Sequence, residues 1–291
     1  EGEVLLTGES ERRVRAHEGA ILEAASDGSR LFTAGDDGRV AATDAGGTTE
    51  TMAAAPGKWI DHLALGPDGA LAWSVGKIAF ARTKKGERAL EVPSTVGGLA
   101  FAPKGLRLAI AHYNGASLWF PNAEATPESL SWKGSHLGVQ WSPEGRFLIT
   151  SMQEPALHGW RVADGQHMRM TGYPTRVRSM AFGAGGKWLA TSGAVEIILW
   201  PFATKDGPMG KQPSMLAPYQ VKVSTVAAHP KQEVIAAGYE DGLVLLIRVA
   251  DGAEVLVRRA DASSVTALAW SDNGERLAFG TETGSAGLVV R

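Results

Sequence analysis

Side chains that could perform chemistry are few in this sequence, and they are not arranged for it. Cysteine is absent, which excludes disulfides, thiolate nucleophiles and Cys-ligated zinc. None of the seven histidines forms a close pair at metal-ligand spacing. The segment QHMRM (166–170) places His and Met at alternate positions, as a copper site would. Because it falls where a peripheral strand is expected, we interpret it as an exposed or half-packed edge and expect no metal.

The common catalytic motifs are also missing from the sequence. It contains no G-x-S-x-G, P-loop, dinucleotide fingerprint, H-E-x-x-H or Asp-rich calcium loop. The segment FGAGGKW (182–188) is rich in glycine, but it lies on a hairpin turn and opens no helix. We therefore expect no catalytic residues and no cofactor, and we do not expect an enzyme.

The overall composition limits the classes of partner. The formal net charge is −2 at pH 7, so no global field attracts nucleic acid or an anionic membrane. No apolar run approaches the roughly 18 residues of a membrane span, and no signal peptide is visible. We expect a cytoplasmic protein that binds neither nucleic acid nor membrane. The start at Glu1 without Met indicates that a leader or an N-terminal segment has been cut away.

One hairpin pattern recurs along the whole chain. VQWSPEGRFLITS (139–151) reads as a strand, a turn and a second strand, and six other segments repeat it. The spacing of 36 to 46 residues is the period of a four-stranded propeller blade. The turns end at Gly28, Gly69, Gly105, Gly145, Gly186, Gln232 and Gly274.

The residues around these turns support the alignment. Six positions before each turn end the residue is always apolar, as at Leu22 and Leu268, and two positions before it Pro recurs in four repeats. Pro presets φ for a turn and Gly tolerates positive φ, so both residues favour a tight turn here. A third strand and a weaker fourth follow in each repeat. A Pro-, Gly- and Lys-rich stretch, residues 201–216, lies between repeats 5 and 6, and we interpret it as a solvated loop between third and fourth strands, with a docking element as the alternative.

The sequence resembles the WD-repeat (WD40) family over nearly its whole length, and most closely its bacterial members, whose roles are mostly undefined. Trp119, Trp160 and Trp200 hold the position of the family's late Trp, but only Thr43-Asp44 keeps an Asp after it. The family often links a His, a Ser or Thr, an Asp and that Trp by hydrogen bonds. Repeat 1 offers His17, Thr33 and Asp37 without the Trp, so we expect blade packing to depend mostly on apolar residues.

The resemblance and the repeat count predict an all-β, seven-bladed β-propeller of four-stranded antiparallel blades, in one domain spanning residues 1–291. No fourth strand follows the last repeat, and ERRVRA (11–16) matches the missing one. Residues 1–16 are therefore predicted to close the ring by joining the C-terminal blade, which removes exposed edges. EVLLTG (3–8) either adds to that blade, which we favour, or is the remnant of an eighth repeat. The predicted repeats are residues 17–47, 57–87, 94–125, 132–166, 173–207, 217–253 and 261–291.

In the resembled family, partners commonly use the face formed by the start of the first strand and the turn between the second and third strands. On this face Arg176, Arg178 and Lys222 gather positive charge on repeats 5 and 6. Trp59 stands where the other repeats carry solvent residue types, so it is a candidate aromatic anchor. Repeat 4 departs from the turn pattern with MQEPALH (152–158), which indicates either a functional loop or drift. The candidate partner-binding residues are Trp59, Asp61, His112, Tyr113, His136, Gln153, Glu154, Arg176, Arg178, Lys222 and Tyr239.

Two functions from different classes follow. The favoured hypothesis is a monomeric, non-catalytic scaffold that binds a protein or peptide on this face. An acidic or phosphorylated peptide would suit the Arg pair, because guanidinium binds carboxylate or phosphate through two parallel hydrogen bonds. The alternative is a propeller enzyme or small-ligand sensor with a site at the mouth of the central channel.

Overall fold

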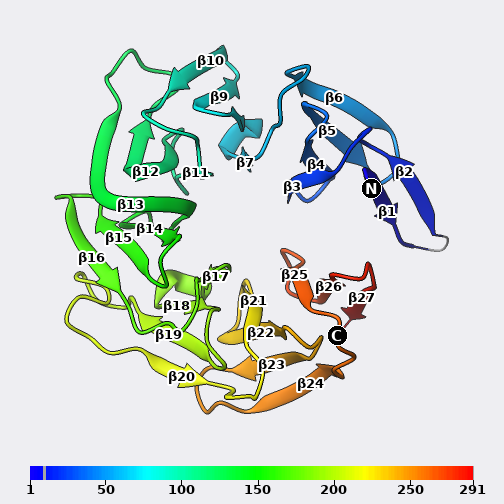
Figure 1. Cartoon of the computed structure of the whole chain (residues 1–291), viewed down its shortest axis with the longest axis vertical. Coiled ribbons are helices and arrows are strands. Elements are labelled where there is room, and N and C mark those ends of the chain that lie inside the picture. Colours follow the sequence, from blue (N-terminus) through cyan, green and yellow to red (C-terminus); the bar gives the residue numbers. More distant parts are fainter. Residues whose placement is uncertain (9–10, 291) are drawn as a thin grey trace. The chain divides into compact units, whose positions relative to one another are not determined.

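The computed structural model describes residues 1–8 and 11–290, and these residues form strands joined by turns (Figure 1). The only helical elements among them are two short 3-10 turns, η1 (Pro67–Gly69) and η2 (Ala184–Gly186). The chain divides into two compact units, Glu1–Trp141 and Ser142–Arg291. All the strand pairings given for the described residues are antiparallel, as expected for hairpin-connected strands.

The first unit contains two four-stranded sheets and a hairpin, and begins a third large sheet. The first four-stranded sheet has the order β3-β4-β5-β6 and the second β10-β9-β8-β7. The strands are β1 (Glu3–Leu6), β2 (Arg12–Arg15), β3 (Ile21–Ser26), β4 (Arg30–Gly35), β5 (Arg39–Asp44), β6 (Thr49–Ala54), β7 (Leu63–Leu65), β8 (Leu71–Val75), β9 (Ile78–Thr83), β10 (Gly86–Glu91), β11 (Gly98–Phe101), β12 (Leu108–Trp119) and β13 (Glu128–Trp141).

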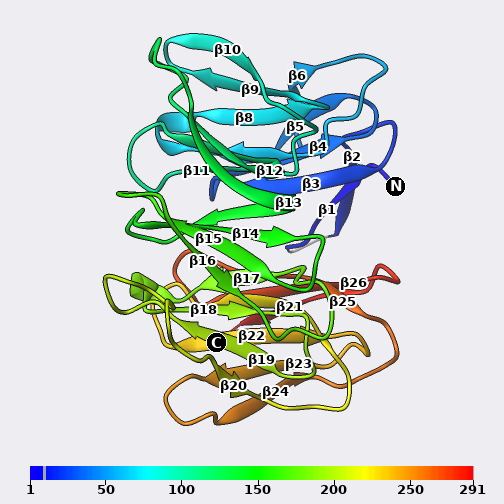
Figure 2. The ribbon, with the colours of Figure 1, turned by 60° about the vertical axis from the view of Figure 1, so that its left-hand side comes forward.

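The second unit contains two four-stranded sheets and one three-stranded sheet after β16. Their orders are β17-β18-β19-β20, β21-β22-β23-β24 and β25-β26-β27. Figure 2 labels the strands of the first two of these sheets. The strands are β14 (Phe147–Met152), β15 (Leu157–Arg161), β16 (Gln166–Met170), β17 (Met180–Phe182), β18 (Trp188–Thr191), β19 (Ile197–Pro201), β20 (Ser214–Leu216), β21 (Val223–Ala228), β22 (Val234–Tyr239), β23 (Val244–Arg248), β24 (Glu254–Arg258), β25 (Val265–Trp270), β26 (Arg276–Thr281) and β27 (Ala286–Val290).

The structure is an all-β propeller with six blades, so the prediction of seven blades is wrong. Strands β11 to β16, which the repeat pattern divides between two blades, belong to one six-stranded sheet. The cause is visible in the first unit. β13 runs unbroken through the predicted border near Trp132, and Ser135 beyond that border pairs with Tyr113 of β12. The segment lacks Pro and Asp-Gly or Asn-Gly pairs, so nothing ends the strand there.

The predicted closure of the last blade is also wrong. Residues 12–15 do not supply a fourth strand to the sheet of β25, β26 and β27, which has three strands among the described residues. β2 pairs instead with β1, in the register Val4↔Val14. The two strands are neighbours in the sequence, so their hairpin forms at low entropic cost. Val4 is buried with Ala16 and Ala41, which anchors the hairpin to the first sheet.

The turn glycines have the conformation that the repeat requires. Gly28, Gly69, Gly105, Gly145, Gly186 and Gly274 all have φ between 67° and 86°, a region that side chains with a Cβ rarely adopt. Repeat 6 has Gln232 at this position, and it uses a side chain instead. His229 Nδ1 accepts hydrogen bonds from the backbone N–H groups of Lys231 and Gln232, each at 3.0 Å, and so holds the turn.

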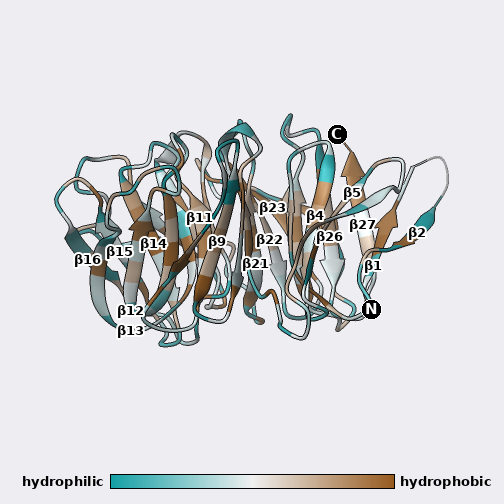
Figure 3. Ribbon diagram, turned by 90° about the horizontal axis from the view of Figure 1, so that it is seen from above, coloured by the Kyte–Doolittle hydropathy of each residue, from teal (hydrophilic) through white to brown (hydrophobic). Residues whose placement is uncertain are grey.

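Apolar side chains on both faces of the sheets make the core. In Figure 3 hydrophobic stretches run along strands such as β9 and β14, while many connecting loops are hydrophilic. Six of the nine tryptophans, among them Trp119, Trp160 and Trp200, are almost fully buried. The half-buried Trp270 and the buried Trp141 hold equivalent first-strand positions. Each donates its indole N–H to a backbone carbonyl of the preceding repeat, Ala227 and Ala100 respectively.

Two peripheral segments place some of their side chains in the core. Residues 201–216 do not form a purely solvated loop, because Phe202 is fully buried and Ser214–Leu216 supplies β20. In QHMRM, Met168 and Met170 are buried in the core shared by β14, β15, β18 and β19. The other three residues of this strand are exposed, so the segment is the half-packed edge that the sequence predicted.

Polar triads replace the family's four-residue network. In repeat 1, His17 contacts Thr33 Oγ1 (2.8 Å) and Asp37 Oδ1 (2.9 Å), as the sequence indicated. In repeat 5 the sequence gave no such indication, yet Tyr173 takes the central place. Its hydroxyl accepts from Trp200 Nε1 (2.6 Å) and lies 2.8 Å from Thr191 Oγ1. Burial raises the pKa of Tyr173 to about 12, so this hydroxyl stays neutral.

We expect Tyr173→Phe to lower the free energy of unfolding by about 1–3 kcal/mol, because the buried indole N–H of Trp200 loses its acceptor. Chemical denaturation measures this. Tyr113→Phe, which alters an exposed ring, is the control and should have little effect. Equal stability of the Tyr173 variant and wild type would contradict this role for the hydroxyl.

Asp37 should make stability depend on pH. Burial alone would raise its pKa, but hydrogen bonds from His17 and from the backbone N–H groups of Glu18 and Arg39 lower it below the usual value. Because the folded pKa is depressed, the stabilisation is present above the unfolded value of about 3.9 and is lost as pH falls through the folded value. We expect Asp37→Asn to be less stable than wild type at pH 7, with the difference shrinking below about pH 4. Urea midpoints across this range test this, and a difference that does not change with pH would contradict it.

Candidate functional site

A cationic cavity of about 190 Å³ lies in the second unit, at one end of three successive sheets. Arg176 and Arg178 precede β17, Lys222 precedes β21 and Ser264 precedes β25. Ser192 and Glu240 follow the second strands β18 and β22. The repeat therefore brings Arg176 and Ser264, which are 88 positions apart, to one place, because equivalent strand ends of successive sheets are neighbours.

Three cations and one carboxylate line this cavity. Lys222 Nζ lies 3.8 Å from Glu240 Oε2, a long and partly exposed ion pair of little energetic value. Arg176 donates to the side-chain oxygen of Gln153 (3.0 Å). The guanidinium of Arg178 is exposed and makes no hydrogen bond or ion pair within the part of the chain that the structure describes. The cavity thus has an excess of positive charge and one unengaged guanidinium.

Val177 explains how both arginines reach this cavity. It is almost fully buried, in the core with Leu189 and Ile198. With Val177 buried between them, Arg176 and Arg178 both line the cavity. The alternation in the sequence therefore sets the direction of both guanidinium groups.

Hydroxyl groups complete the lining, and Ser192 is the most informative. Its Oγ accepts hydrogen bonds from the backbone N–H groups of Arg178 (3.3 Å) and Ser179 (3.0 Å). Ser192 is buried, and its own hydroxyl proton has no acceptor among the described residues. It can therefore donate to a bound group. Ser224, by contrast, donates its proton to the carbonyl of Val265 (2.6 Å).

The irregular loop of repeat 4 reaches the same site through Gln153. Gln153 and Glu154 are exposed in the turn between β14 and β15, and Ala156, which follows Pro155, is buried. The contact between Gln153 and Arg176 holds one guanidinium at the margin of the cavity. Glu154 lies beside it in sequence and has no side-chain contact among the described residues.

In the first unit, two candidates are exposed aromatic residues. Trp59 is 64% exposed and directly precedes the fully buried Ile60, while Tyr113 is 52% exposed in β12. Asp61 is half-buried, before β7. These residues remain available to a partner.

Three further candidates are buried, and their side chains are hydrogen-bonded within the fold. His112 is buried, with Nε2 3.0 Å from Ser117 Oγ and Nδ1 2.9 Å from the carbonyl of Tyr113. His136 is buried against the carbonyl of Trp132 (3.0 Å). Tyr239 is fully buried and donates to the carbonyl of Ala217 (2.9 Å). Burial raises the pKa of Tyr239, with Glu254 and Asp241 adding to the effect, so it stays neutral.

Sequence reasoning missed Thr175, Ser192 and Gly193 in the cavity lining. A signal was present, because Ser192 and Gly193 directly follow a second strand, which is the turn where repeat 4 and repeat 6 supplied candidates. Small hydroxyl residues are common in turns, so their type alone did not distinguish them from ordinary turn residues.

The cavity is suited to binding an anion. Its polar lining offers guanidinium, ammonium and hydroxyl donors, with Glu240 as the one carboxylate. Among residues 1–8 and 11–290, no group of three or more His, Cys, Asp or Glu side chains is placed to hold a metal ion. No helix in that part of the chain is long and apolar enough to cross a membrane.

The fold defines the class of the protein as a β-propeller, and comparisons with known proteins agree. Residues 226–290, from within β21 to the end of β27, match the family model described as "Anaphase-promoting complex subunit 4 WD40 domain". Among solved structures, the chain is similar to "Crystal structure of RRP9 WD40 repeats" (TM-score 0.68) and to "Structure of U3-55K" (TM-score 0.69). Each is 16% identical to this chain and covers 96% of it, and the chain covers 90% and 91% of theirs respectively. No curated protein matches the sequence.

At this identity the solved structures show the fold alone, and the family model covers only the last part of the chain. Together they support the WD40-repeat β-propeller that the repeat pattern indicated.

Ser192→Ala should loosen the segment that carries the arginines, because the backbone N–H groups of Arg178 and Ser179 lose their common acceptor. We expect faster amide hydrogen exchange at residues 178 and 179 and a loss of about 1–2 kcal/mol in stability. Ser264→Ala is the control, since Ser264 lines the same cavity without a side-chain hydrogen bond among the described residues. Unchanged exchange at both positions would show that Ser192 does not hold this segment.

Proposed function

We propose that this chain is a non-catalytic interaction scaffold whose cationic cavity binds an acidic segment of a partner protein. The observation that supports this most directly is the group formed by Arg176, Arg178 and Lys222 around one cavity, with the Arg178 guanidinium unengaged. A carboxylate between the two guanidinium groups could form charge-assisted hydrogen bonds to both, which are stronger than neutral ones. The WD40-repeat fold fits this role, because such propellers typically present binding faces to other proteins.

The remaining groups at the cavity suit a peptide better than an isolated ion. Ser192 can donate one further hydrogen bond, and Glu240 can accept from a backbone N–H or a basic side chain of the partner. Gln153 and Glu154 extend the polar surface beyond the cavity along the β14–β15 turn. An extended segment with an acidic residue at its centre could therefore use the cavity and its margin together.

Binding of the peptide Ac-Glu-Glu-Asp-Glu-Glu-NH2 tests the proposal, with its amide counterpart Ac-Gln-Gln-Asn-Gln-Gln-NH2 as the uncharged probe. We expect the acidic peptide to bind more tightly, with affinity falling as salt rises. Arg178→Glu should weaken binding at least about tenfold, because it replaces attraction by repulsion in a partly desolvated site. Fluorescence anisotropy with labelled peptides measures both effects.

Arg276→Glu makes the same change of charge at an exposed position that begins β26, at the opposite end of its sheet from the cavity, and it should leave affinity nearly unchanged. Equal binding of the acidic and amide peptides would overturn the proposal. Equal losses in the Arg178 and Arg276 variants would also count against it, because they would indicate an effect of net charge alone.

A further inference from the structure

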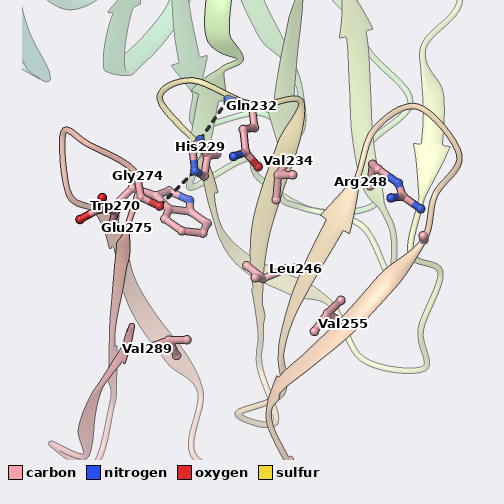
Figure 4. Close-up of a pocket in the computed structure, with 11 residues that line it drawn as sticks. His229, Gln232, Val234, Leu246, Arg248, Val255, Trp270, Gly274, Glu275 and Val289 are labelled. Carbon is pink, nitrogen blue, oxygen red and sulfur yellow. Dashed lines mark hydrogen bonds between the residues drawn. The ribbon is translucent and has the colours of Figure 1, made fainter. Parts of the chain in front are cut away.

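A second cavity, of about 430 Å³, opens between the sheet β21–β24 and the sheet β25–β27 (Figure 4). Its lining is mainly apolar and includes Val234, Leu246, Val255, Trp270 and Val289. It lies at the other end of the strands from the cationic cavity. Lys222 precedes β21, for example, whereas His229, which lines this second cavity, follows it.

Strand register shows which faces form this cavity. Leu246 is paired with Ala236 on one side and Val255 on the other, so the three share one face of their sheet. In the next sheet Leu277 is paired with both Trp270 and Val289, which therefore share a face. In Figure 4, Trp270 and Val289 lie on one side of the space, opposite Val234, Leu246 and Val255 on the other. These two faces form a wedge between the sheets.

The equivalent wedges between the preceding sheets of this unit are filled by aromatic rings. Phe147 and Trp188 begin their second strands two residues after the turn ends Gly145 and Gly186, and Val234 stands two residues after Gln232. Phe147 is buried against the next sheet, with its ring 5.3 Å from that of Phe202. Trp188 is buried in the core that contains Ile235 and Ile247 of the next sheet. Val234 leaves the equivalent place without a ring.

The facing wall shows the same loss of size. Trp200 of β19 pairs with Leu189 of β18, and it packs in the core with Phe147. The equivalent partner of Leu277 in β27 is Val289. Compared with the wedge beside Phe147, a ring is thus missing from both walls; beside Trp188 the residue equivalent to Val289 is Ile247, so there one wall alone supplies the ring. The cavity follows from this deficit because interiors are otherwise close-packed.

The outer side of the wedge is open to solvent. Val255 is 60% exposed, whereas Met168 at the equivalent position of β16 is 5% exposed. β27 is the last strand of its sheet among the described residues, so its outer backbone N–H and C=O groups are unpaired there. An exposed apolar wedge beside a free strand edge is therefore accessible to another chain.

We propose that this cavity binds an aromatic side chain, Trp or Phe, from an extended segment of a partner protein. The protein itself supports this choice, because the two preceding wedges hold Trp and Phe at the same place. The free edge of β27 offers backbone hydrogen bonds to an extended segment, a mode by which strands join exposed sheet edges. The aromatic ring would bury the apolar faces of Val234, Leu246 and Val289 and lie beside the Trp270 indole.

The test compares two neutral probes, Ac-Thr-Trp-Thr-NH2 and Ac-Thr-Ala-Thr-NH2, by NMR titration of the full chain. We expect the Trp peptide to bind at least about tenfold more tightly, because only it fills the cavity with apolar surface. Val234→Phe restores from one wall the ring that Phe147 provides in an earlier wedge, and Val289→Trp restores from the other wall the ring of Trp200. Each variant should weaken Trp-peptide binding at least about tenfold, because it occupies the space.

Val195→Phe is the matched control, since it adds a ring at an exposed position outside the cavity and should leave binding unchanged. Equal affinities of the two peptides for wild type would overturn the proposal, and so would full binding by both filled variants. If one filled variant does not fold, the other variant and the comparison of peptides on wild type still decide. Arg178→Glu should not affect these neutral probes, so the result is independent of the acidic-peptide proposal.

Discussion

The wedge between successive sheets is the constraint on which most of this structure depends. A sheet that has another sheet on each side is covered on both faces, so its side chains must fill the space toward both neighbouring sheets. Phe147 and Trp188 meet this requirement from the start of the second strand, and Met168 and Met170 meet it from the fourth. Most polar groups in the core are correspondingly paired, as in the contacts of Tyr173 with Thr191 and Trp200. Where volume is missing, as beside Val234, the fold leaves a cavity rather than collapsing, because the strand ladders fix the distance between the sheets.

The same repetition separates structure from function along each strand. The strand interiors carry the core, while the residues at the two ends of the strands are free to differ between repeats. At one end the differences gather Arg176, Arg178 and Lys222, and at the other end they leave the apolar cavity beside Trp270. Both features lie where the chain departs from its own pattern. Loops and strand ends tolerate such change because few backbone ladders pass through them.

The period and turn chemistry of the sequence predicted much of the fold. The hairpins, the second strands and the packed tryptophans lie at the positions that the repeat alignment predicted. The predicted number of blades is wrong because of β13. No Pro or Asn-Gly interrupts the chain there, so the strand continues across the predicted border between two repeats. The closure failed because the local hairpin of β1 and β2 forms in place of a distant pairing. Neither outcome is visible in a repeat alignment, since pairing partners are chosen by competition between whole strands.

For the candidate site, the sequence by itself determined which residues stand at equivalent strand ends. The Arg-Val-Arg alternation, with an apolar residue between two cations, also fixed that both guanidinium groups face away from the core. Only the tertiary structure decided burial. In the folded chain His112, His136 and Tyr239 are buried and contact carbonyl or hydroxyl groups. Ser192 accepts a hydrogen bond from the backbone of Arg178. The physical reason is that a position in the repeat alignment specifies only the strand end on which a residue lies. The direction of a side chain at a bulge or turn depends on the hydrogen bonds and the side-chain volumes that neighbouring strands supply.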